Sequence, residues 1–246
     1  MTSVDVVVPV YNEERALPQS IPVLRGFLSA SFPFEWRIVI ADNASVDNTP
    51  AVAQGLAGAN SGEVEYVRIE RKGRGFALKQ TWLASPMDIV SYMDVDLSTD
   101  LEAFPALIGA IANNGYHVAV GSRLASESQI TRSLKRRVLT RGYNTLIKAM
   151  FRTHFSDAQC GFKAVSREAA ESIVPLIEDN NWFFDTELLI LAEKMGYRVK
   201  DVPVKWVEDM DTRVKIAATV TEDLRGLLRL RTNRPWRRAD GKPKID

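Results

Sequence analysis

Two aspartates that flank a single valine, Asp94-Val95-Asp96, directly follow a hydrophobic run at residues 89–93. Carboxylates at positions i and i+2 can jointly bind a hard divalent cation such as Mg²⁺ or Mn²⁺. A cation held in this way can neutralise a diphosphate leaving group. A solvated acidic loop has the same pattern and explains most isolated D-x-D sequences. The hydrophobic run before the motif favours the metal site.

Another carboxylate, Asp42, follows a hydrophobic run at residues 36–41. A carboxylate at the end of a buried strand can accept hydrogen bonds from a nucleotide. However, the segment Asp42-Asn43-Ala44-Ser45 also has the composition of a turn. The residues alone leave the nucleotide-binding role and the turn-forming role of Asp42 equally open.

Basic residues follow two further hydrophobic runs. Residues 71–75 combine two glycines with three basic side chains, Arg74 among them, so this segment could approach and pair with a phosphate. Arg123 follows the run at residues 117–120 and could bind phosphate in the same way. Charged turns and solvated helix faces are the alternatives, and the spacing at residues 71–75 is not that of a P-loop. A third basic group comprises Arg136, Arg137 and Arg141.

The remaining reactive side chains are predicted to be structural. Cys160 is the single cysteine and has no histidine near it in the sequence, while His117 and His154 are isolated. A zinc site and a Cys/His nucleophile are therefore not expected. A single cysteine excludes an intramolecular disulfide, which fits a reducing compartment. The segment Thr221-Glu222-Asp223 resembles an acidic catalytic triplet, but the favoured interpretation is an acidic pair at the start of a helix.

The elements that position these side chains follow from two alternating hydrophobic periods in the first 120 residues. Strands are expected at residues 4–10, 36–41, 64–69, 89–93 and 117–120. Helices are expected at residues 13–30, 47–59, 76–84 and 101–112, with Asp47 as a candidate cap. This alternation predicts a mostly parallel sheet covered by helices on both faces. Ligands of such sheets bind beyond the carboxyl ends of the strands, where Asp42, Asp94 and Arg123 are expected.

The second half of the chain has a different character. Residues 131–155 form a long basic and apolar segment, and residues 157–165 lead from a loop into a short strand. Further helices are expected at residues 166–177, 184–195 and 213–231, with a strand at residues 197–204. The prediction is one α/β domain over residues 1–230 with C-terminal helical elaborations, followed by a basic tail over residues 231–246.

The composition excludes several classes of protein. Of the 246 residues 26% are charged, and the net charge of +1 provides no field that would attract nucleic acid. No run approaches the ~20 apolar residues that span a bilayer. The first apolar run contains Asp5 and lacks a cationic flank, so no signal peptide is expected. We therefore expect a globular protein that neither binds nucleic acid nor crosses a membrane.

Four motifs, in order along the chain, resemble one family. They are Pro-Val-Tyr-Asn-Glu-Glu at residues 9–14, the segment 42–49, the D-x-D at residues 94–96 and Gly-Ser-Arg at residues 121–123. The segment 42–49 is similar to D-D-G-S-x-D-x-T, with Asn43 and Ala44 in place of the usual aspartate and glycine. Together the motifs resemble the family 2 inverting glycosyltransferases. This resemblance implies a GT-A fold, which is Rossmann-like, with a mostly parallel sheet flanked by helices.

The second half is similar to dolichyl-phosphate glucosyltransferases, which belong with dolichol-phosphate mannose synthases among the polyprenyl-phosphate glycosyltransferases. The similarity lies in residues 157–163 (D-x-Q-C-G-F-K), 182–189 and 202–206, and the whole resemblance covers residues 4–230. It implies inverting transfer of a sugar from a nucleotide-diphosphate sugar to a polyprenyl phosphate. The second half favours a UDP-hexose or UDP-N-acetylhexosamine as donor over GDP-mannose.

The resemblance also implies roles for individual residues. The donor would be held by Pro9, Tyr11, Glu13, Asp42, Arg74, Asp94, Val95 and Asp96. The catalytic set would be Asp94, Asp96 and Arg123, with Asp94 and Asp96 binding Mg²⁺ or Mn²⁺. The acceptor phosphate would contact Arg123, Arg136, Thr140, Arg213 and Lys215. Ser98 stands where mannose synthases often carry a glutamine ligand, so a third protein ligand is in doubt.

The expected acceptor determines the expected mechanism. A polyprenyl phosphate is ionised near pH 7 and can attack the anomeric carbon without a dedicated general base. Catalysis would then depend on positioning and on neutralising the departing diphosphate. A polysaccharide or protein acceptor would instead require a carboxylate base, with Asp157, Asp185 and Glu187 as candidates. A nucleotide-binding module without catalysis is a further alternative, against which the D-x-D argues.

A lipid acceptor requires contact with a bilayer. Residues 138–155 have the composition of an interfacial amphipathic helix, although a core-packing helix with a basic face fits equally well. Basic residues of the tail could contact anionic lipid or solubilise the end of the chain. They are Arg234, Arg237, Arg238, Lys242 and Lys244. The expected location is cytoplasmic and peripheral on the inner face of the membrane, with a separate membrane protein as a possible partner.

Overall fold

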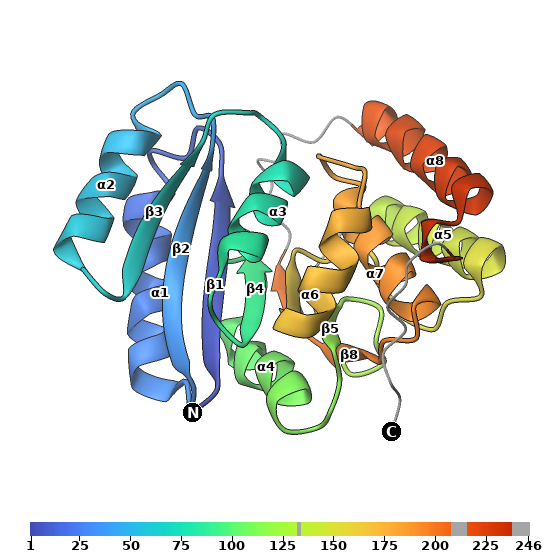
Figure 1. Cartoon of the computed structure of the whole chain (residues 1–246), viewed down its shortest axis with the longest axis horizontal. Coiled ribbons are helices and arrows are strands. Elements are labelled where there is room, and N and C mark those ends of the chain that lie inside the picture. Colours follow the sequence, from blue (N-terminus) through green and yellow to red (C-terminus); the bar gives the residue numbers. More distant parts are fainter. Residues whose placement is uncertain (132–133, 208–215, 238–246) are drawn as a thin grey trace.

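The computed structural model describes residues 1–131, 134–207 and 216–237, without the side chains of residues 131, 134–136 and 216–219. A seven-stranded sheet runs through these residues and carries helices on both faces (Figure 1). From one edge to the other its strands are β3 (Val64–Ile69), β2 (Glu35–Asn43), β1 (Ser3–Val10), β4 (Ile89–Met93), β7 (Phe162–Ser166), β5 (Val118–Ser122) and β8 (Val199–Pro203).

The directions of the strands bring most of their carboxyl ends to one edge of the sheet. Strands β1, β2, β3 and β4 pair in parallel, as do β5 and β8. Strand β7 is antiparallel to both β4 and β5, so β4 and β5 point the same way. The prediction of a mostly parallel sheet is confirmed, and the amino end of β7 joins the ligand edge.

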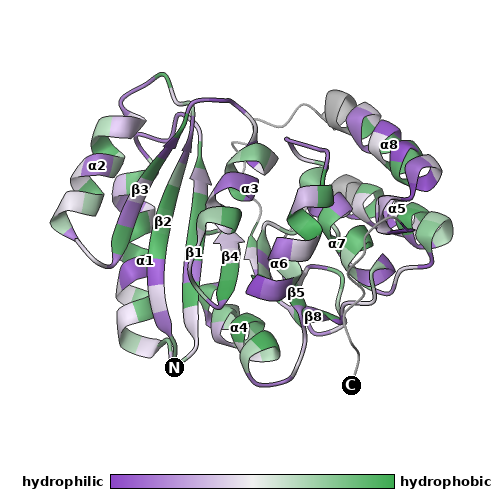
Figure 2. Cartoon of the chain, in the orientation of Figure 1, coloured by the Kyte–Doolittle hydropathy of each residue, from purple (hydrophilic) through white to green (hydrophobic). Residues whose placement is uncertain are grey.

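The strands are predominantly hydrophobic, as expected for a sheet that is buried on both faces (Figure 2). Asp5, the charged residue of β1, is buried opposite Arg37 of β2. Its carboxylate accepts hydrogen bonds from Arg37 Nη2 at 2.8 Å and from the Ser85 hydroxyl at 2.6 Å. This buried charge is therefore fully partnered and supports the register of β1 on β2.

Eight α-helices and three short 3₁₀ helices lie within the described residues. The α-helices are α1 (Leu17–Ser31), α2 (Thr49–Ala59), α3 (Arg74–Ala84), α4 (Phe104–Ala112), α5 (Leu134–Phe151), α6 (Arg167–Ile173), α7 (Phe184–Lys194) and α8 (Ile216–Asn233). The 3₁₀ helices are η1 (Leu101–Ala103), η2 (Val174–Leu176) and η3 (Pro235–Arg237). A two-stranded sheet pairs β6 (Gln129–Thr131) with β9 (Lys205–Val207).

Helices α5 and α8 lie side by side at the end of the molecule away from α1 and α2 (Figure 1). On α5, Ile147 and Phe151 are buried, whereas Leu139 and Leu146 are exposed. The helix thus has a core-packing face and a separate exposed apolar face. No described helix has the length and hydropathy that a bilayer span requires.

Some helix limits differ from the predicted ones. The first helix begins at Leu17, and residues 12–14 before it are instead bonded to the loop after β2. The second begins at Thr49, whose N–H donates to the Asp47 carboxylate at 3.0 Å. The first turn of the predicted helix at residues 101–112 is the 3₁₀ helix η1, and the predicted helix at 166–177 ends in η2.

The last helix corrects two predictions. Helix α8 begins at Ile216, so Glu222-Asp223 lies about two turns inside it and does not start it. The helix also continues through Asn233, past the expected beginning of the tail at residue 231. Residues 208–215 and 238–246 lie outside the described residues.

Candidate active site

The loop after β1 and the loop after β2 are bonded to each other. The N–H of Asn12 donates to Ser45 Oγ at 3.0 Å, and Asn12 Oδ1 accepts from the N–H of Val46 at 2.9 Å. The N–H of Glu13 donates to Thr49 Oγ1 at 2.8 Å. The first two sequence motifs therefore form one surface at the ligand edge. Pro9, at the end of β1, and Tyr11 lie beside it, and Lys72 Nζ lies 3.7 Å from the centre of the Tyr11 ring.

Asp42 is fully buried beneath this surface. One carboxylate oxygen accepts the N–H of Ser45 at 2.9 Å, which is the turn-forming contact considered from the sequence. The other accepts the Tyr66 hydroxyl and Arg68 Nη1, each at 2.9 Å. Asp42 therefore has a structural role in the turn, and its contact with a nucleotide stays a prediction.

Arg74, the first residue of α3, connects two carboxylates that are far apart in the sequence. Its Nη2 donates to Asp94 Oδ1 at 3.0 Å and its Nη1 donates to Asp185 Oδ2 at 2.8 Å. The guanidinium also lies over the rings of Tyr92 and Trp182. Burial alone would lower the pKa of Arg74, but Tyr92 and the two carboxylates raise it well above its usual range. Arg74 is thus a permanent cation inside the site.

Lys163 is a second buried cation in the same network. Its ammonium group donates to Asp185 Oδ1 at 2.9 Å and to the Cys160 carbonyl oxygen at 2.6 Å. The Tyr92 hydroxyl donates to the same Asp185 oxygen. Lys163 was visible in the sequence only as the last residue of the D-x-Q-C-G-F-K segment, and its pairing with Asp185 was not predicted.

The D-x-D aspartates stand where β4 ends. Asp94 has 46% of its side chain open to solvent, and Asp96 is exposed, with Oδ1 accepting the N–H of Ser98 at 3.0 Å. Desolvation raises the pKa of Asp94, and the Asp96 carboxylate adds to the rise against the effect of Arg74. A Cβ atom on Gly161 would lie 1.8 Å from Asp94 Oδ2, so this glycine makes the space for the carboxylate.

These two carboxylates suit a hard divalent cation that keeps water and phosphate oxygens as its other ligands. Within the described residues, no group of three or more His, Cys, Asp or Glu side chains could form a complete protein cage for a metal ion. Ser98 contributes its backbone N–H to Asp96 and its carbonyl oxygen to Val207. The donor set therefore fits a metal shared with a substrate better than a metal enclosed by the protein.

Arg123, directly after β5, is held by Asp157. Its Nε and Nη2 donate to the two carboxylate oxygens at 2.7 and 3.0 Å, and its backbone N–H donates at 3.1 Å. The guanidinium lies 5.4 Å from the centre of the Trp206 ring. One edge of Arg123 is therefore occupied by the protein, which fixes the direction in which the group can approach a ligand.

The three candidate bases are all engaged in ion pairs. Burial would raise the pKa of Asp157, but Arg123 holds it below its usual value. Lys163 and Arg74 likewise hold the pKa of Asp185 below its usual value despite burial.

The third, Glu187, differs in the direction of its shift. Burial raises its pKa, although Arg229 Nη2 lies 2.6 Å away and the backbone N–H groups of Glu178 and Asp179 donate to it. Glu187 is fully buried among these donors and is not open to an acceptor.

Asp223 is a buried titratable group that the sequence interpretation assigned to the start of a helix. It is buried on α8, and one oxygen accepts Gln159 Nε2 at 3.0 Å. Within the described part of the chain its other oxygen has no hydrogen-bond partner. Burial raises the pKa of Asp223 to about 7. The triplet Thr-Glu-Asp was the available signal, but the expected helix start concealed its burial.

The structure treats the four expected acceptor-phosphate residues of the second half unequally. Thr140 is buried on α5. Val95, which was expected to bind the donor and stands between the two aspartates of the D-x-D, packs against the core. The side chain of Arg136 is not among those described, and Arg213 and Lys215 lie outside the described residues. Their roles stay predictions.

The three side chains expected to be structural have different surroundings. Cys160 is buried, and burial raises the pKa of its thiol to about 12. His117 Nδ1 accepts the N–H of Arg198, and His154 is exposed beside Glu193.

Residues 5–174 match the family described as Glycosyl transferase family 2. With the sheet and the D-x-D site, this match defines the class: the chain belongs to glycosyl transferase family 2 and has a GT-A fold. The family expected from the motifs is confirmed.

Two relatives are similar in sequence over most of this chain. Glycosyltransferase AglD of Haloferax volcanii is 36% identical over 218 residues, which cover 88% of this chain and 35% of that protein. The dolichyl-phosphate beta-glucosyltransferase of Drosophila melanogaster is 31% identical over 216 residues, covering 82% of this chain and 66% of that protein. The chain thus spans about a third of the length of the first relative and just under two thirds of the second.

Solved structures share the fold at low sequence identity. Glucosyl-3-phosphoglycerate synthase from Mycobacterium tuberculosis, in complex with Mn²⁺, UDP-glucose and phosphoglyceric acid, has a TM-score of 0.70 at 18% identity, covering 94% of this chain and 79% of that chain. Its complex with UDP has a TM-score of 0.69 at 19% identity, covering 94% and 80%. At these identities the similarity establishes the fold alone.

Proposed function

We propose that this chain catalyses the inverting transfer of a sugar from a nucleotide-diphosphate sugar to a polyprenyl phosphate. The relatives named dolichyl-phosphate beta-glucosyltransferases support this class of acceptor. The UDP and UDP-glucose complexes of the structural relative support a uridine nucleotide in the donor. We favour a UDP-hexose or a UDP-N-acetylhexosamine, with GDP-mannose as the alternative.

The observation that carries this proposal is the state of the candidate bases. Asp157 and Asp185 each face a buried cation that lowers their pKa, and Glu187 is enclosed among donors. A carboxylate with a lowered pKa is a poor general base. An acceptor hydroxyl would need a base, whereas an ionised phosphate would not. The arrangement therefore favours a phosphate acceptor over a polysaccharide or protein acceptor.

The site residues keep the roles that we assign to them from the resemblance. Pro9, Tyr11, Glu13 and Asp42 would surround the nucleoside, and Arg74 would face the diphosphate. Arg123, oriented by Asp157, would lie between the donor and acceptor phosphates, where its fixed charge favours the transition state. The acceptor phosphate would also contact Arg136, Thr140, Arg213 and Lys215.

Asp94 and Asp96 would hold a Mg²⁺ or Mn²⁺ ion, as the Mn²⁺ complexes of the structural relative support. When bound, the ion supplies positive charge to the departing diphosphate. Arg74 and the space at Gly161 keep the Asp94 carboxylate in place for this role.

The location that we propose is the cytoplasmic face of a membrane, with the chain bound peripherally. A polyprenyl phosphate is embedded in a bilayer, and the exposed apolar side chains of α5, Leu139 and Leu146, offer a contact with it. A separate membrane protein as partner stays a prediction.

The test is a panel of nucleotide sugars incubated with a short-chain polyprenyl phosphate and Mg²⁺ or Mn²⁺. We expect one UDP-sugar to give a lipid-phosphate product with inverted anomeric configuration. The variant Asp96→Ala should retain the fold, measured by circular dichroism, and lose turnover. Retained configuration in the product, or normal turnover of Asp96→Ala, would contradict the mechanism. Transfer only to a polysaccharide or peptide would contradict the acceptor.

A further inference from the structure

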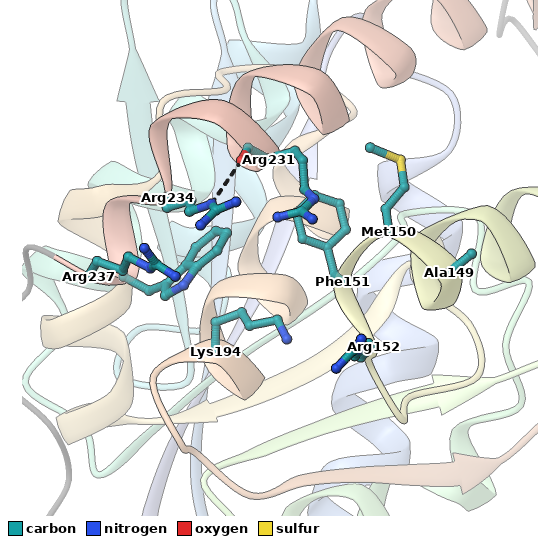
Figure 3. Close-up of a pocket in the computed structure, with 9 residues that line it drawn as sticks. Ala149, Met150, Phe151, Arg152, Lys194, Arg231, Arg234 and Arg237 are labelled. Carbon is teal, nitrogen blue, oxygen red and sulfur yellow. Dashed lines mark hydrogen bonds between the residues drawn. The ribbon is translucent and has the colours of Figure 1, made fainter.

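A basic pocket lies between the C-terminal ends of α5, α7 and α8, at the end of the molecule away from α1 and α2 (Figures 1 and 3). We define it by five cations, which lie in or directly after the last turns of these helices and in η3. They are Arg152, Lys194, Arg231, Arg234 and Arg237. Its volume is about 400 Å³, which is enough for a phosphate-bearing group. Nothing in the proposed sugar transfer uses this pocket.

The walls of the pocket join these charges to an aromatic side chain. Trp236 lines it and packs edge-on against Phe151, with 6.2 Å between the ring centres. Figure 3 shows Arg231 and Lys194 directed from opposite sides toward the same space.

These charges are not neutralised by the described part of the chain. No carboxylate among the described residues lies within ion-pair distance of any of the five cations. Arg234 Nε donates to the carbonyl oxygen of Arg231 at 3.2 Å, which is a neutral acceptor. Glu193 lies next to Lys194 in the sequence, but it accepts the backbone N–H groups of His154 and Phe155 instead. Five like charges that meet no counter-charge within the described residues make a site for an anion.

Two of the four arginines of the pocket occupy strained backbone positions. Arg152 has φ 54° directly after α5, and Arg234 has φ 46° directly after α8. Glycine is the usual residue in this left-handed conformation, because a side chain there is unfavourable. An arginine at both helix ends therefore costs stability that glycine would not, and such strain is typical of functional positions.

The helix dipole offers a simpler account of basic residues at helix ends. One cation near each carboxyl terminus is favourable. This accounts for Lys194 at the end of α7 and for one arginine each at α5 and α8. It does not account for Arg237, which follows α8 in η3, or for the choice of arginine where glycine fits best.

An exposed apolar stripe leads into the pocket along α8. Val220, Leu224 and Leu228 are 45%, 45% and 61% exposed and follow one another at intervals of one helical turn. Arg231 follows Val220 by about three turns, so it lies on the same face of the helix. On α5, Leu139 and Leu146 are exposed, and Met150 lines the pocket beyond them.

We propose that the basic pocket binds the phosphate of an anionic phospholipid headgroup while these apolar stripes contact the acyl region. A soluble phosphate or diphosphate shares the charge chemistry, but it would leave the two exposed stripes without a partner. Trp236 fits a lipid surface because aromatic side chains concentrate at the level of the headgroups. The pocket thus orients the chain on a bilayer independently of the sugar donor.

The test is co-sedimentation of the full chain with two kinds of vesicle, one of phosphatidylcholine alone and one of phosphatidylcholine with phosphatidylglycerol. We expect binding to the second and little to the first. In the double variant Arg231→Gln/Arg237→Gln, each lost arginine should weaken binding about fivefold. The matched control is Arg225→Gln, an exposed arginine of α8 that does not line the pocket. It should bind like the wild type.

A second variant separates binding from folding. Arg234→Gly removes one charge and relieves the left-handed backbone, so it should raise the unfolding temperature while weakening vesicle binding. Sugar transfer to a water-soluble short-chain acceptor should be unchanged in all these variants.

Three results would overturn the proposal. One is unchanged vesicle binding in the double variant, and another is an equal loss in Arg225→Gln. The third is binding of inorganic phosphate alone, measured by calorimetry, with an affinity equal to that for the anionic vesicles. That result would identify a soluble anion as the ligand. Failure of the proposed sugar transfer would leave these measurements interpretable, because none of the vesicle experiments requires turnover.

Discussion

Asp94 is held by contacts from two other segments of the chain. Its carboxylate accepts from Arg74, its backbone N–H donates to the carbonyl oxygen of Gly161, and Asp96 lies two residues away. Gly161 leaves the space that the carboxylate fills. The position of this metal-binding candidate therefore depends on a residue that carries no functional group.

The variant Gly161→Ala tests this dependence. A methyl group 1.8 Å from Asp94 Oδ2 must displace the flexible carboxylate, while the surrounding backbone can stay in place. We expect turnover to fall about 100-fold, because small misplacements of catalytic groups cost about that much. Steady-state kinetics with the preferred UDP-sugar would measure the loss.

A matched glycine provides the control. A Cβ atom on Gly26 of α1 would meet no other atom within 4 Å, so Gly26→Ala should keep full turnover and gain about 0.5–1 kcal/mol of stability. Equal turnover in Gly161→Ala and Gly26→Ala would show that Gly161 does not position Asp94.

At the scale of elements, backbone strain is concentrated at two places. Non-glycine residues with left-handed φ values occur at Asn12, Ala44 and Leu97, in the loops after β1, β2 and β4. Within the described residues the other two are Arg152 and Arg234, which line the basic pocket. Strained positions therefore coincide with the candidate active site and the proposed lipid site, as stored strain commonly does at functional sites.

Helix α8 carries a carboxyl group, Asp223, whose ionised form is disfavoured by burial. The folded protein raises the pKa of Asp223 from 3.8 to about 7, so the folded state binds its proton more tightly than the unfolded state. The contribution of this group to stability is therefore most favourable below about pH 4 and is lost as the pH rises to about 7.

The variant Asp223→Asn should remove this loss. At pH 8 we expect its free energy of unfolding to exceed that of the wild type by about 2 kcal/mol, with little difference at pH 4. Urea unfolding at both pH values would measure this, with the exposed neighbour Glu222→Gln as control. A variant that is less stable than the wild type at pH 8 would show that the carboxylate makes a favourable contact.

At the scale of the whole molecule, charges of opposite sign alternate through the centre of the site. Asp94, Arg74, Asp185 and Lys163 form a chain of contacts that joins β4, α3, α7 and β7. Both carboxylates in this series of contacts, Asp94 and Asp185, face a cation. The site is therefore suited to holding charged groups in position, and both Asp94 and Asp185 are already paired with a cation.

This arrangement predicts the pH dependence of the proposed reaction. An acceptor phosphate has a second pKa of about 6, so kcat/KM should fall below about pH 6 and stay level to about pH 8. Turnover measured across this range with a short-chain polyprenyl phosphate tests it. A limb near pH 7 that disappears in Asp223→Asn would identify Asp223 as a base and would contradict the proposed mechanism.

Much of the fold follows from local patterns in the sequence. The hydrophobic runs at residues 4–10, 36–41 and 89–93 predicted strands, and these runs became β1, β2 and β4. The turn-forming contact of Asp42, one of its two interpretations, is present. The start of the last helix was predicted less well, because Glu222 and Asp223 have the composition of a helix terminus although they lie inside α8.

The sequence by itself determined the alternation of strands and helices and brought the D-x-D to the ligand edge, because hydrophobic period and strand direction are local properties. The family also followed from short ordered motifs. Only the tertiary structure decided that Arg74 joins Asp94 to Asp185, although Asp185 lies 111 residues from Arg74 in the sequence. The same holds for the space that Gly161 leaves for Asp94. It also gathered the basic pocket from three helix ends. Such contacts depend on how the elements pack, and no local pattern encodes them.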